Sequence, residues 1–306
     1  MIDPQALLAH PALEVPYAYG PRDVMLHALG CGMGTDPMDP VQLRYVYDAP
    51  RQPLLALPTL PIVLGWVDLV RDPRSRDPRL GIDPDQIVVG QAVLTLLRMP
   101  GTEGRGTART FYHAVVDKGA GRGALVCVRR EVRAADAVLL ATVDTWLFAR
   151  GDGGFGGPRD GAPARHPTPE RPPDMTVVQP TPANLALTYR LSLGDHNAVH
   201  ADPAHAQRTG FARPILHGLA TFSMALHGAV RAATGDLIAH APCLRQAGAT
   251  LTRPVFPGDT LHTDVWREEG AIVFRTRVPE RAVEVVGAGR IELAATPSAL
   301  HDAGPH

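Results

Sequence analysis

The segment 189–221, which reads YRLSLGDHNAVHADPAHAQRTGFARPILHGLAT, contains the side chains of this chain that are best suited to acid–base chemistry. It holds a carboxylate at Asp195, an amide at Asn197 and an imidazole at His200, followed by Gly218 at the expected start of a long helix. A carboxylate and an imidazole can move protons, and the positive end of a helix can stabilise a developing oxyanion. Chemistry on a thioester-activated substrate needs this combination of groups.

Residues 194–200 read Gly-Asp-His-Asn-Ala-Val-His and resemble the signature of the MaoC-like (R)-specific enoyl-CoA hydratases, commonly written Gly-Asp-x-Asn-Pro-hydrophobic-His. The segment is especially similar to the two-repeat form called hydratase 2, which is found in eukaryotic multifunctional β-oxidation enzymes and in bacteria. Ala198 replaces the usual proline, which costs the loop some stiffness but removes no chemical group. The downstream stretch 214–221, PILHGLAT, matches at the expected distance.

The resemblance implies reversible hydration of a trans-2-enoyl-CoA to an (R)-3-hydroxyacyl-CoA. Asp195 and His200 would hold the attacking water between them, one removing a proton while the other helps to deliver one to Cα. The sequence leaves open which residue does which. Asn197 either orients the water or His200, or forms an Asx turn, and the N–H of Gly218 either polarises the thioester oxygen or belongs to a glycine needed for close packing.

The bulk composition describes an ordinary globular protein. A chain of 306 residues with 45% hydrophobic and 20% charged residues predicts about two domains with packed cores. The formal net charge of −1 argues against a polycationic surface for nucleic acid or membranes. The three cysteines form no CxxC pattern, so we expect a reducing compartment.

We expect a cytoplasmic protein. The first residues, MIDPQALLAH, lack the basic region and apolar run of a signal peptide. No uninterrupted apolar stretch approaches the length of a membrane span, and the last residues, HDAGPH, are not the Ser-Lys-Leu peroxisomal signal.

A Gly- and Pro-rich linker over residues 151–175 divides the chain almost equally. The halves, residues 1–150 and 176–306, each show a helix and a series of β-prone runs, which predicts an α+β fold. The family resemblance implies two hot-dog repeats, each an antiparallel sheet wrapped around a central helix.

The expected elements follow from hydrophobic periodicity and turn residues. In the first half, we predict a helix over residues 21–29 and strands over 91–97, 107–116, 124–132 and 138–148. In the second half, we predict a helix over residues 215–233 and strands over 186–193, 247–252, 260–268, 271–278 and 283–293.

The first half carries further resemblances to hydratase 2, among them the segments 17–19, 57–59, 117–119 and 153–157. It departs from the family at Val89-Gly90-Gln91-Ala92, where members often have His-Gly-Glu-Gln. It also has no Asp-x-Asn-x-x-His counterpart. We therefore expect one active site per chain and a non-catalytic first repeat that accommodates the acyl tail, with the apolar segment 54–64 as a candidate wall of the tail channel.

The binding residues for coenzyme A are less specific in the sequence. Arg208, Arg213 and Arg253 are candidates for its phosphates, although exposed arginines are usually only solvated. Beyond the coenzyme A carried by the substrate we expect no cofactor, and the resemblance implies a homodimer.

The histidines invite a metal hypothesis that the sequence does not favour. His196, His205, His217 and His227 lie in the second half, but His200 and His205 are five residues apart, which is not HExxH spacing. No metal site is therefore predicted.

Two other functions remain open from the sequence. A hot-dog thioesterase also presents a carboxylate and a helix-end amide to a thioester, and a non-catalytic acyl-CoA-binding protein would use the same cavity. The Asp-x-Asn-x-x-His arrangement favours hydration over both, since a binding protein needs no pair of proton-transferring groups.

Overall fold

The computed structural model describes residues 2–294. Its main feature is an antiparallel sheet of ten strands in the order β1-β3-β4-β5-β2-β7-β10-β9-β8-β6. The strands are β1 (Leu13–Tyr19), β2 (Ile87–Leu96), β3 (Gly104–Asp117), β4 (Ala124–Ala134), β5 (Leu139–Ala149), β6 (Met175–Pro180), β7 (Leu244–Leu251), β8 (Thr260–Glu268), β9 (Ala271–Val278) and β10 (Val283–Leu293).

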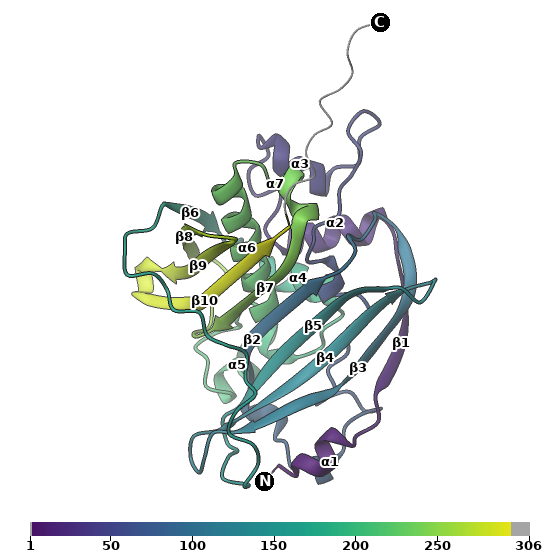
Figure 1. Ribbon diagram of the computed structural model, residues 1–306, viewed down its shortest axis with the longest axis vertical. Helices are drawn as coiled ribbons and strands as arrows, with labels where there is room; N and C mark the ends of the chain where they lie inside the picture. The colour runs from purple at the N-terminus through teal and green to yellow at the C-terminus, as the bar shows by residue number, and fades with distance from the viewer. Residues whose placement is uncertain (1, 295–306) are drawn as a thin grey trace, which may run out of the picture.

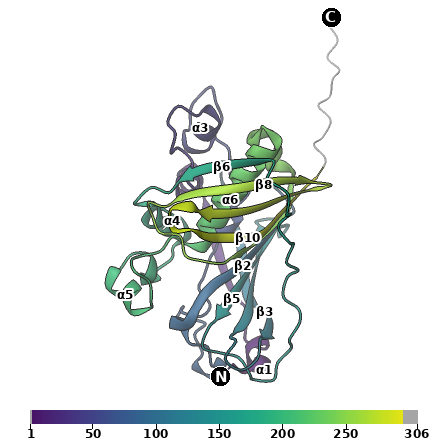
Figure 2. The same ribbon diagram turned by 90° about the vertical axis from the view of Figure 1, so that its left-hand side faces the viewer.

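The two halves of this sheet have the same strand order. In the first half, β1-β3-β4-β5-β2 follow one another, and in the second β6-β8-β9-β10-β7 do so, with β2 pairing with β7 at the junction. Figure 1 shows the two halves as two fans of strands that meet there, and Figure 2 shows them from the side. The repeated order confirms the expected double hot-dog fold.

The α-helices are α1 (Pro4–Leu8), α2 (Pro21–Gly30), α3 (Pro40–Val46), α4 (Leu185–Leu193), α5 (Pro203–Arg208), α6 (Gly218–Thr234) and α7 (Leu237–His240). Short 3-10 turns lie at Leu60–Ile62, Pro78–Leu80, Pro84–Gln86, Ala198–His200, Ala241–Cys243 and Pro279–Arg281. Within residues 2–294, no helix is long and apolar enough to cross a membrane.

Helix α6 is the central helix of the second repeat and is buried over nearly its whole length against the strands of that repeat. It begins at Gly218 rather than at residue 215, because the preceding backbone is held extended: the N–H of Leu216 donates to the carbonyl of Val255, and His217 has ψ 133°. This start places the N-terminus of α6 at the junction of the two repeats.

The first repeat is built differently around its helices. After β1 come only the short α2 and α3, and residues 47–86 then run to β2 with 3-10 turns as their sole helical structure. Part of this irregular chain packs against the sheet, because the turn Leu60–Ile62 contacts β5. The difference matters for the site, because residues 66–69 and Arg71 of this segment line a cavity.

The prediction of a strand over residues 186–193 was wrong, because these residues form helix α4. The buried side chains Leu185, Ala186, Tyr189 and Leu193 recur at helical spacing, and the helix packs against α2 with Tyr189 directly over Gly30. A short apolar run is ambiguous between strand and helix, and here tertiary packing against α2 decides. The sequence also gave no signal strong enough to predict β1 and β6.

Residues 151–174 contain turns and bends but no helix or strand. The glycines of this segment are held by Asp117 at the end of β3, whose carboxylate accepts the N–H groups of Gly154 at 2.7 Å and Gly156 at 2.8 Å, and also that of Gly119 at 2.8 Å. Gly153 adopts φ +118°, and a Cβ there would lie 2.5 Å from the carbonyl oxygen of Gly119. Glycine is therefore required at this close approach.

Candidate active site

The loop that carries Asp195, Asn197 and His200 is shaped by its own side chains. Helix α4 ends at Gly194, which adopts φ 73°, and the chain then turns so that the Asp195 carboxylate accepts the N–H of Asn197 at 2.8 Å. The side-chain oxygen of Asn197 in turn accepts the N–H of Val199 at 3.2 Å and caps the 3-10 turn that ends at His200. Asn197 therefore forms the Asx-type cap, while its amide NH₂ group remains available to the cavity that it lines.

The orientation of His200 fixes which of its nitrogens can accept a proton. Nδ1 lies 2.9 Å from the carbonyl oxygen of Ile215, and because a carbonyl can only accept, Nδ1 carries the hydrogen. In the neutral ring, Nε2 is then a free acceptor. This atom lies 3.8 Å from Oδ2 of Asp195.

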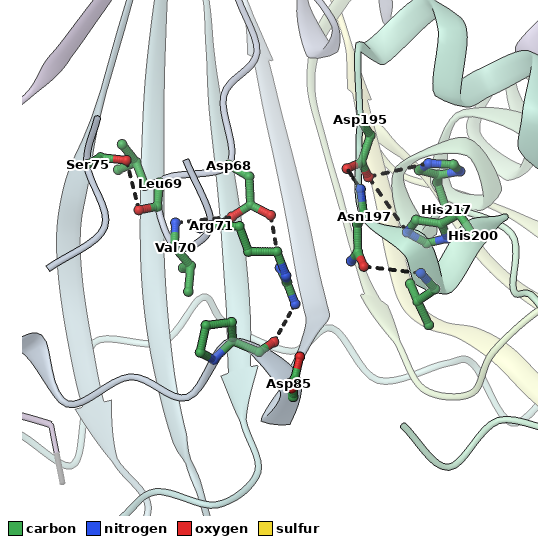
Figure 3. A network of polar contacts seen from close by, with 12 residues as sticks. Asp68, Leu69, Val70, Arg71, Ser75, Asp85, Asp195, Asn197, His200 and His217 are labelled. Carbon is green, nitrogen blue, oxygen red and sulfur yellow. Dashed lines mark hydrogen bonds and ion pairs between the residues drawn. The ribbon is translucent and has the colours of Figure 1, made fainter. Parts of the chain in front are cut away.

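A second imidazole, that of His217, completes the cluster from the N-cap position of α6. Its Nε2 lies 3.4 Å from the same Oδ2 of Asp195, and its ring stacks on that of His200 with centroids 3.6 Å apart. The side chain of His217 is only 3% exposed. Figure 3 shows Asp195 facing both rings.

Burial and mutual interactions set the charges of this cluster. Burial alone raises the pKa of Asp195, but contacts with His217 and His200 and the Asn197 N–H outweigh it and leave the pKa below its usual value. Burial, reinforced by the neighbouring His217, lowers the pKa of His200 to about 3. Burial also lowers the pKa of His217 despite the adjacent carboxylate. At neutral pH, the site therefore holds one carboxylate and two neutral imidazoles.

Gly218 is the first residue of α6 and lines the same cavity as Asp195 and His200. Its N–H belongs to the first turn of the helix, where backbone donors have no partner within the helix. A Cβ at this position would lie 2.5 Å from Cδ1 of Leu251. Glycine therefore serves close packing here and also leaves a backbone donor open to the cavity.

The cavity joins the two repeats and has a volume of about 420 Å³. One side holds the cluster of Asp195, His200 and His217, and the opposite side holds Arg71, which pairs with Asp68 at 2.9 Å. Figure 3 shows this ion pair across from the Asp195 cluster. The inner face of the first repeat continues the wall with mostly apolar side chains, Val128, Val143 and Leu147 among them.

The other residues singled out in the sequence lie at different places. Arg253 lines the cavity and is exposed, whereas Arg208 and Arg213 are exposed outside its lining. Arg213 lies over the ring of Phe256, with 5.0 Å between the guanidinium carbon and the ring centroid. Arg150, which the sequence did not single out, is a second exposed arginine on the lining.

One expectation about the first half needs correction, and one of its departures from the family pattern lies in the cavity. Leu60 and Ile62 of the apolar segment 54–64 belong to the hydrophobic core, and the cavity is lined instead by residues that follow, starting at Trp66. Val89 lies in the lining next to Gly218, so the segment that departs from the family pattern belongs to the site itself. Its neighbour Gln91 donates to Thr250 at 3.1 Å across the β2–β7 junction.

The geometry brings together three groups of a kind that can bind metals. Asp195, His200 and His217 each offer one ligand atom, and these atoms all lie within 4.8 Å of one another. The histidines considered from the sequence do not form such a group, except for His217. Spacing along the chain could not reveal the trio, because His217 approaches Asp195 only after the chain returns from α5 to α6.

His217 and Arg71 are the site residues that sequence reasoning missed. The signal for His217 was present, since it lies in the first turn of the helix expected over residues 215–233 and so within reach of any group at the helix N-terminus. No signal marked Arg71, which lies in the irregular segment between α3 and β2.

Comparison with known proteins places these features in a family. The MFE-2 hydratase 2 N-terminal domain matches residues 17–151 and the MaoC-like domain matches residues 164–288. The chain is 34% identical to enoyl-CoA hydratase ChsH3 of Mycobacterium tuberculosis, over 94% of this chain and 97% of that protein. It is 31% identical to the peroxisomal enoyl-CoA hydratase 2 of Arabidopsis thaliana, over 96% of each protein.

A solved structure agrees with these sequence matches. The MaoC-like dehydratase from Phytophthora capsici is 28% identical and superimposes with a TM-score of 0.78, covering 95% of this chain and 98% of that one. Because both halves match in order and over nearly their whole length, the chain belongs to the MaoC-like hydratase 2 family.

Proposed function

We propose that this protein is a hydro-lyase that reversibly adds water to a trans-2-enoyl-CoA to give an (R)-3-hydroxyacyl-CoA. The observation that carries the proposal is the pair of acceptors formed by Asp195 Oδ2 and His200 Nε2, which lie 3.8 Å apart on a cavity beside the N-terminus of α6. Two acceptors do not bond to each other, but one water molecule can donate a hydrogen to each. The relatives named as enoyl-CoA hydratases support this reaction, and the (R) stereochemistry is what the family resemblance implies.

The reaction follows from this placement. The water oxygen attacks Cβ, the electrons of the double bond move toward Cα and the thioester oxygen, and the N–H of Gly218 stabilises the charge that develops there. One acceptor removes a proton from the water, and because neither acceptor carries a transferable proton beforehand, this same proton is then delivered to Cα, so that one molecule of water is added overall. His200 and Asp195 are both unprotonated at neutral pH, so either can serve as the base.

The two repeats take different roles in this proposal. The second repeat supplies the reacting groups, and the concave face of the first repeat accommodates the acyl tail along the apolar wall formed by Val128 and Val143. Exposed arginines on the lining, Arg150 and Arg253, are placed to meet the phosphates of coenzyme A.

The reaction should need no cofactor beyond the coenzyme A of the substrate, because the proposed acid–base pair and oxyanion donor account for every step. Hydration that survives dialysis against EDTA, and is not raised by added Zn²⁺, would support this. Loss of activity on chelation would instead assign the trio of Asp195, His200 and His217 to a metal.

We further propose a homodimer, which the family resemblance supports, and a location in the cytoplasm, whereas relatives from other organisms are named peroxisomal. Light scattering during size-exclusion chromatography tests the dimer, and cell fractionation tests the location.

The decisive experiment compares two readouts on crotonyl-, decenoyl- and a branched enoyl-CoA. Loss of enoyl absorbance without release of free thiol, with an (R)-3-hydroxy product on chiral analysis, supports hydration. Thiol release would indicate a thioesterase, and tight binding without either change would indicate an acyl-CoA-binding protein.

A further inference from the structure

Arg130 is a charged residue in the otherwise mostly apolar wall that the first repeat contributes to the cavity. It lies on β4 directly between Thr110 of β3 and Val143 of β5. Its side chain lines the cavity together with Val128, two residues earlier on the same face of the strand. Only 4% of Arg130 is exposed.

The guanidinium of Arg130 has almost no partners within the described residues. Nη2 donates to the carbonyl of Ile62, while Nε, also buried, has no acceptor. No carboxylate forms an ion pair with it, and burial lowers its pKa to about 10, which leaves it charged at neutral pH. The next residue, Arg129, points to the opposite face and is held by Asp144 with bonds of 2.6 and 2.7 Å.

Other polar groups near Arg130 also lack partners. Thr110 lies opposite Arg130 on the neighbouring strand, and its hydroxyl is buried with no hydrogen-bond partner. The hydroxyl of Tyr189 is likewise unpartnered, and the positive charge of Arg130 opposes the rise that burial causes in the pKa of Tyr189. A buried charge without a partner is costly, and buried polar groups are normally hydrogen-bonded. Thr110 and Tyr189 lie outside the cavity lining, whereas Arg130 is part of it. A buried guanidinium with unmet donors on a cavity wall therefore points to a ligand with acceptor oxygens.

We propose that Arg130 is a specificity-determining residue that binds a carboxylate on the acyl portion of the substrate, so that the preferred substrates are enoyl thioesters whose tail ends in a carboxylate. A carboxylate supplies the missing counter-charge and can accept more than one guanidinium hydrogen. The inference rests on the proposed function only in taking the cavity as the site of the acyl group. Coenzyme A phosphates do not fit this position, because the wall around Arg130 is buried and apolar, whereas Arg150 and Arg253 are exposed on the same cavity.

The test compares enoyl-CoAs that end in a carboxylate with methyl-ended ones of equal length, over hexenoyl, octenoyl and decenoyl chains. The wild-type protein should favour the carboxylate-ended member of at least one pair by roughly tenfold to a hundredfold in kcat/KM. Arg130→Met should abolish that preference and leave the methyl-ended substrate equal or better, whereas Arg130→Lys should keep part of it. Arg129→Met, on the opposite face of β4, is the matched control and should leave the ratio unchanged.

Binding is measured in parallel with saturated acyl-CoAs of both kinds, so that the result does not depend on turnover. One outcome separates the two proposals. If no enoyl-CoA is hydrated, but the wild-type protein binds the carboxylate-ended acyl-CoA more tightly than the methyl-ended one and Arg130→Met does not, then the proposed hydration is wrong and the role of Arg130 stands. Equal affinity for both kinds at every length overturns the role of Arg130, whatever the activity. Equal loss on both substrates in Arg130→Met also overturns it, because that pattern belongs to a structural arginine that holds the Ile62 carbonyl.

Discussion

The rings of His200 and His217 stack in parallel, with centroids 3.6 Å apart and 19° between their planes, and both approach Oδ2 of Asp195. The two histidines come from different elements, one from the 3-10 turn after α4 and the other from the N-cap of α6. Their stacking couples the motif loop to the helix whose first residue, Gly218, lines the same cavity. A change in one ring should therefore affect both the proposed proton-transferring pair and the proposed oxyanion donor.

His217 should act by keeping Asp195 ionised. His217→Phe preserves the ring stack but removes the contact to the carboxylate, so the buried Asp195 should become easier to protonate. We expect the acid limb of kcat/KM to move to higher pH by about one unit, with a lower kcat at neutral pH. His217→Gln, which keeps an N–H donor, should shift the acid limb of kcat/KM less. Identical acid limbs in the wild-type protein and His217→Phe would mean that His217 contributes packing alone and does not affect the pKa of Asp195.

Gly218 can be tested with a pair of variants that add the same Cβ. Gly218→Ala and Gly218→Pro both press on Leu251, where a Cβ would lie 2.5 Å from Cδ1, but only proline removes the N–H. Proline is tolerated at a helix start, and His217 already has the extended ψ of 133° that a following proline requires. Gly218→Pro should have a kcat roughly 10²–10³-fold below that of Gly218→Ala. Equal kcat in the two folded variants would exclude Gly218 as the oxyanion donor.

The wall of the first repeat should set chain-length preference rather than chemistry. Val128 lines the cavity from β4, so Val128→Phe should shorten the space for the tail and lower kcat/KM for decenoyl-CoA at least tenfold, consistent with an overpacking cost of about 1–3 kcal/mol. Crotonyl-CoA turnover should stay near the wild-type value. Leu125→Phe, on the opposite face of the same strand, is the control, and equal losses on both substrates would show that Val128 supports the fold instead of the tail.

Much of the fold could be predicted from the sequence, and the reason is local. Strands β8, β9 and β10 have the predicted bounds, because they are β-prone apolar runs of strand length separated by turns with Gly, Asp or Pro. Helix α4 was misread because an apolar stretch of eight or nine residues satisfies either period until its packing partner is known. Here the partner is α2, which lies more than 150 residues away in the chain.

The site was less predictable, because only part of it is contiguous in sequence. Asp195, Asn197 and His200 share one loop and carry a family motif, so their proximity was evident. His217, Val89 and Arg71 join them only through the fold, and nothing in a strand-like run around Arg130 distinguishes a cavity-facing arginine from an exposed one. To predict such residues, one must know the register of β4 and the path of residues 47–86, and both depend on tertiary packing.

The pH dependence of hydration should lack the inflection of an ordinary histidine. The pKa of His200 is lowered to about 3 and that of Asp195 lies below its usual value, so both are in their unprotonated, active forms throughout the neutral range. We expect kcat/KM for crotonyl-CoA to be flat from about pH 6 to 9 and to fall only as the pH drops toward these low values. Circular dichroism at each pH separates loss of activity from unfolding. A titration near pH 6.5, the usual value for histidine, would show that His200 gains a proton in the free enzyme after all.

Asp195 and His200 should behave as one unit, because a single water must donate to both acceptors. Asp195→Asn and His200→Gln keep approximate size while removing the ability to take a proton, and each should lower kcat by roughly 10²-fold or more with a modest change in KM. Once either acceptor is lost, the water is no longer held in the attacking position, so the double variant should be little slower than the slower single one. His196→Gln, next to Asp195 but exposed, is the control and should retain the wild-type rate. If the double variant shows the product of the two single losses, the residues act on separate steps and the model of one shared water is wrong. If either folded single variant hydrates crotonyl-CoA at the wild-type rate, that residue takes no part in acid–base catalysis.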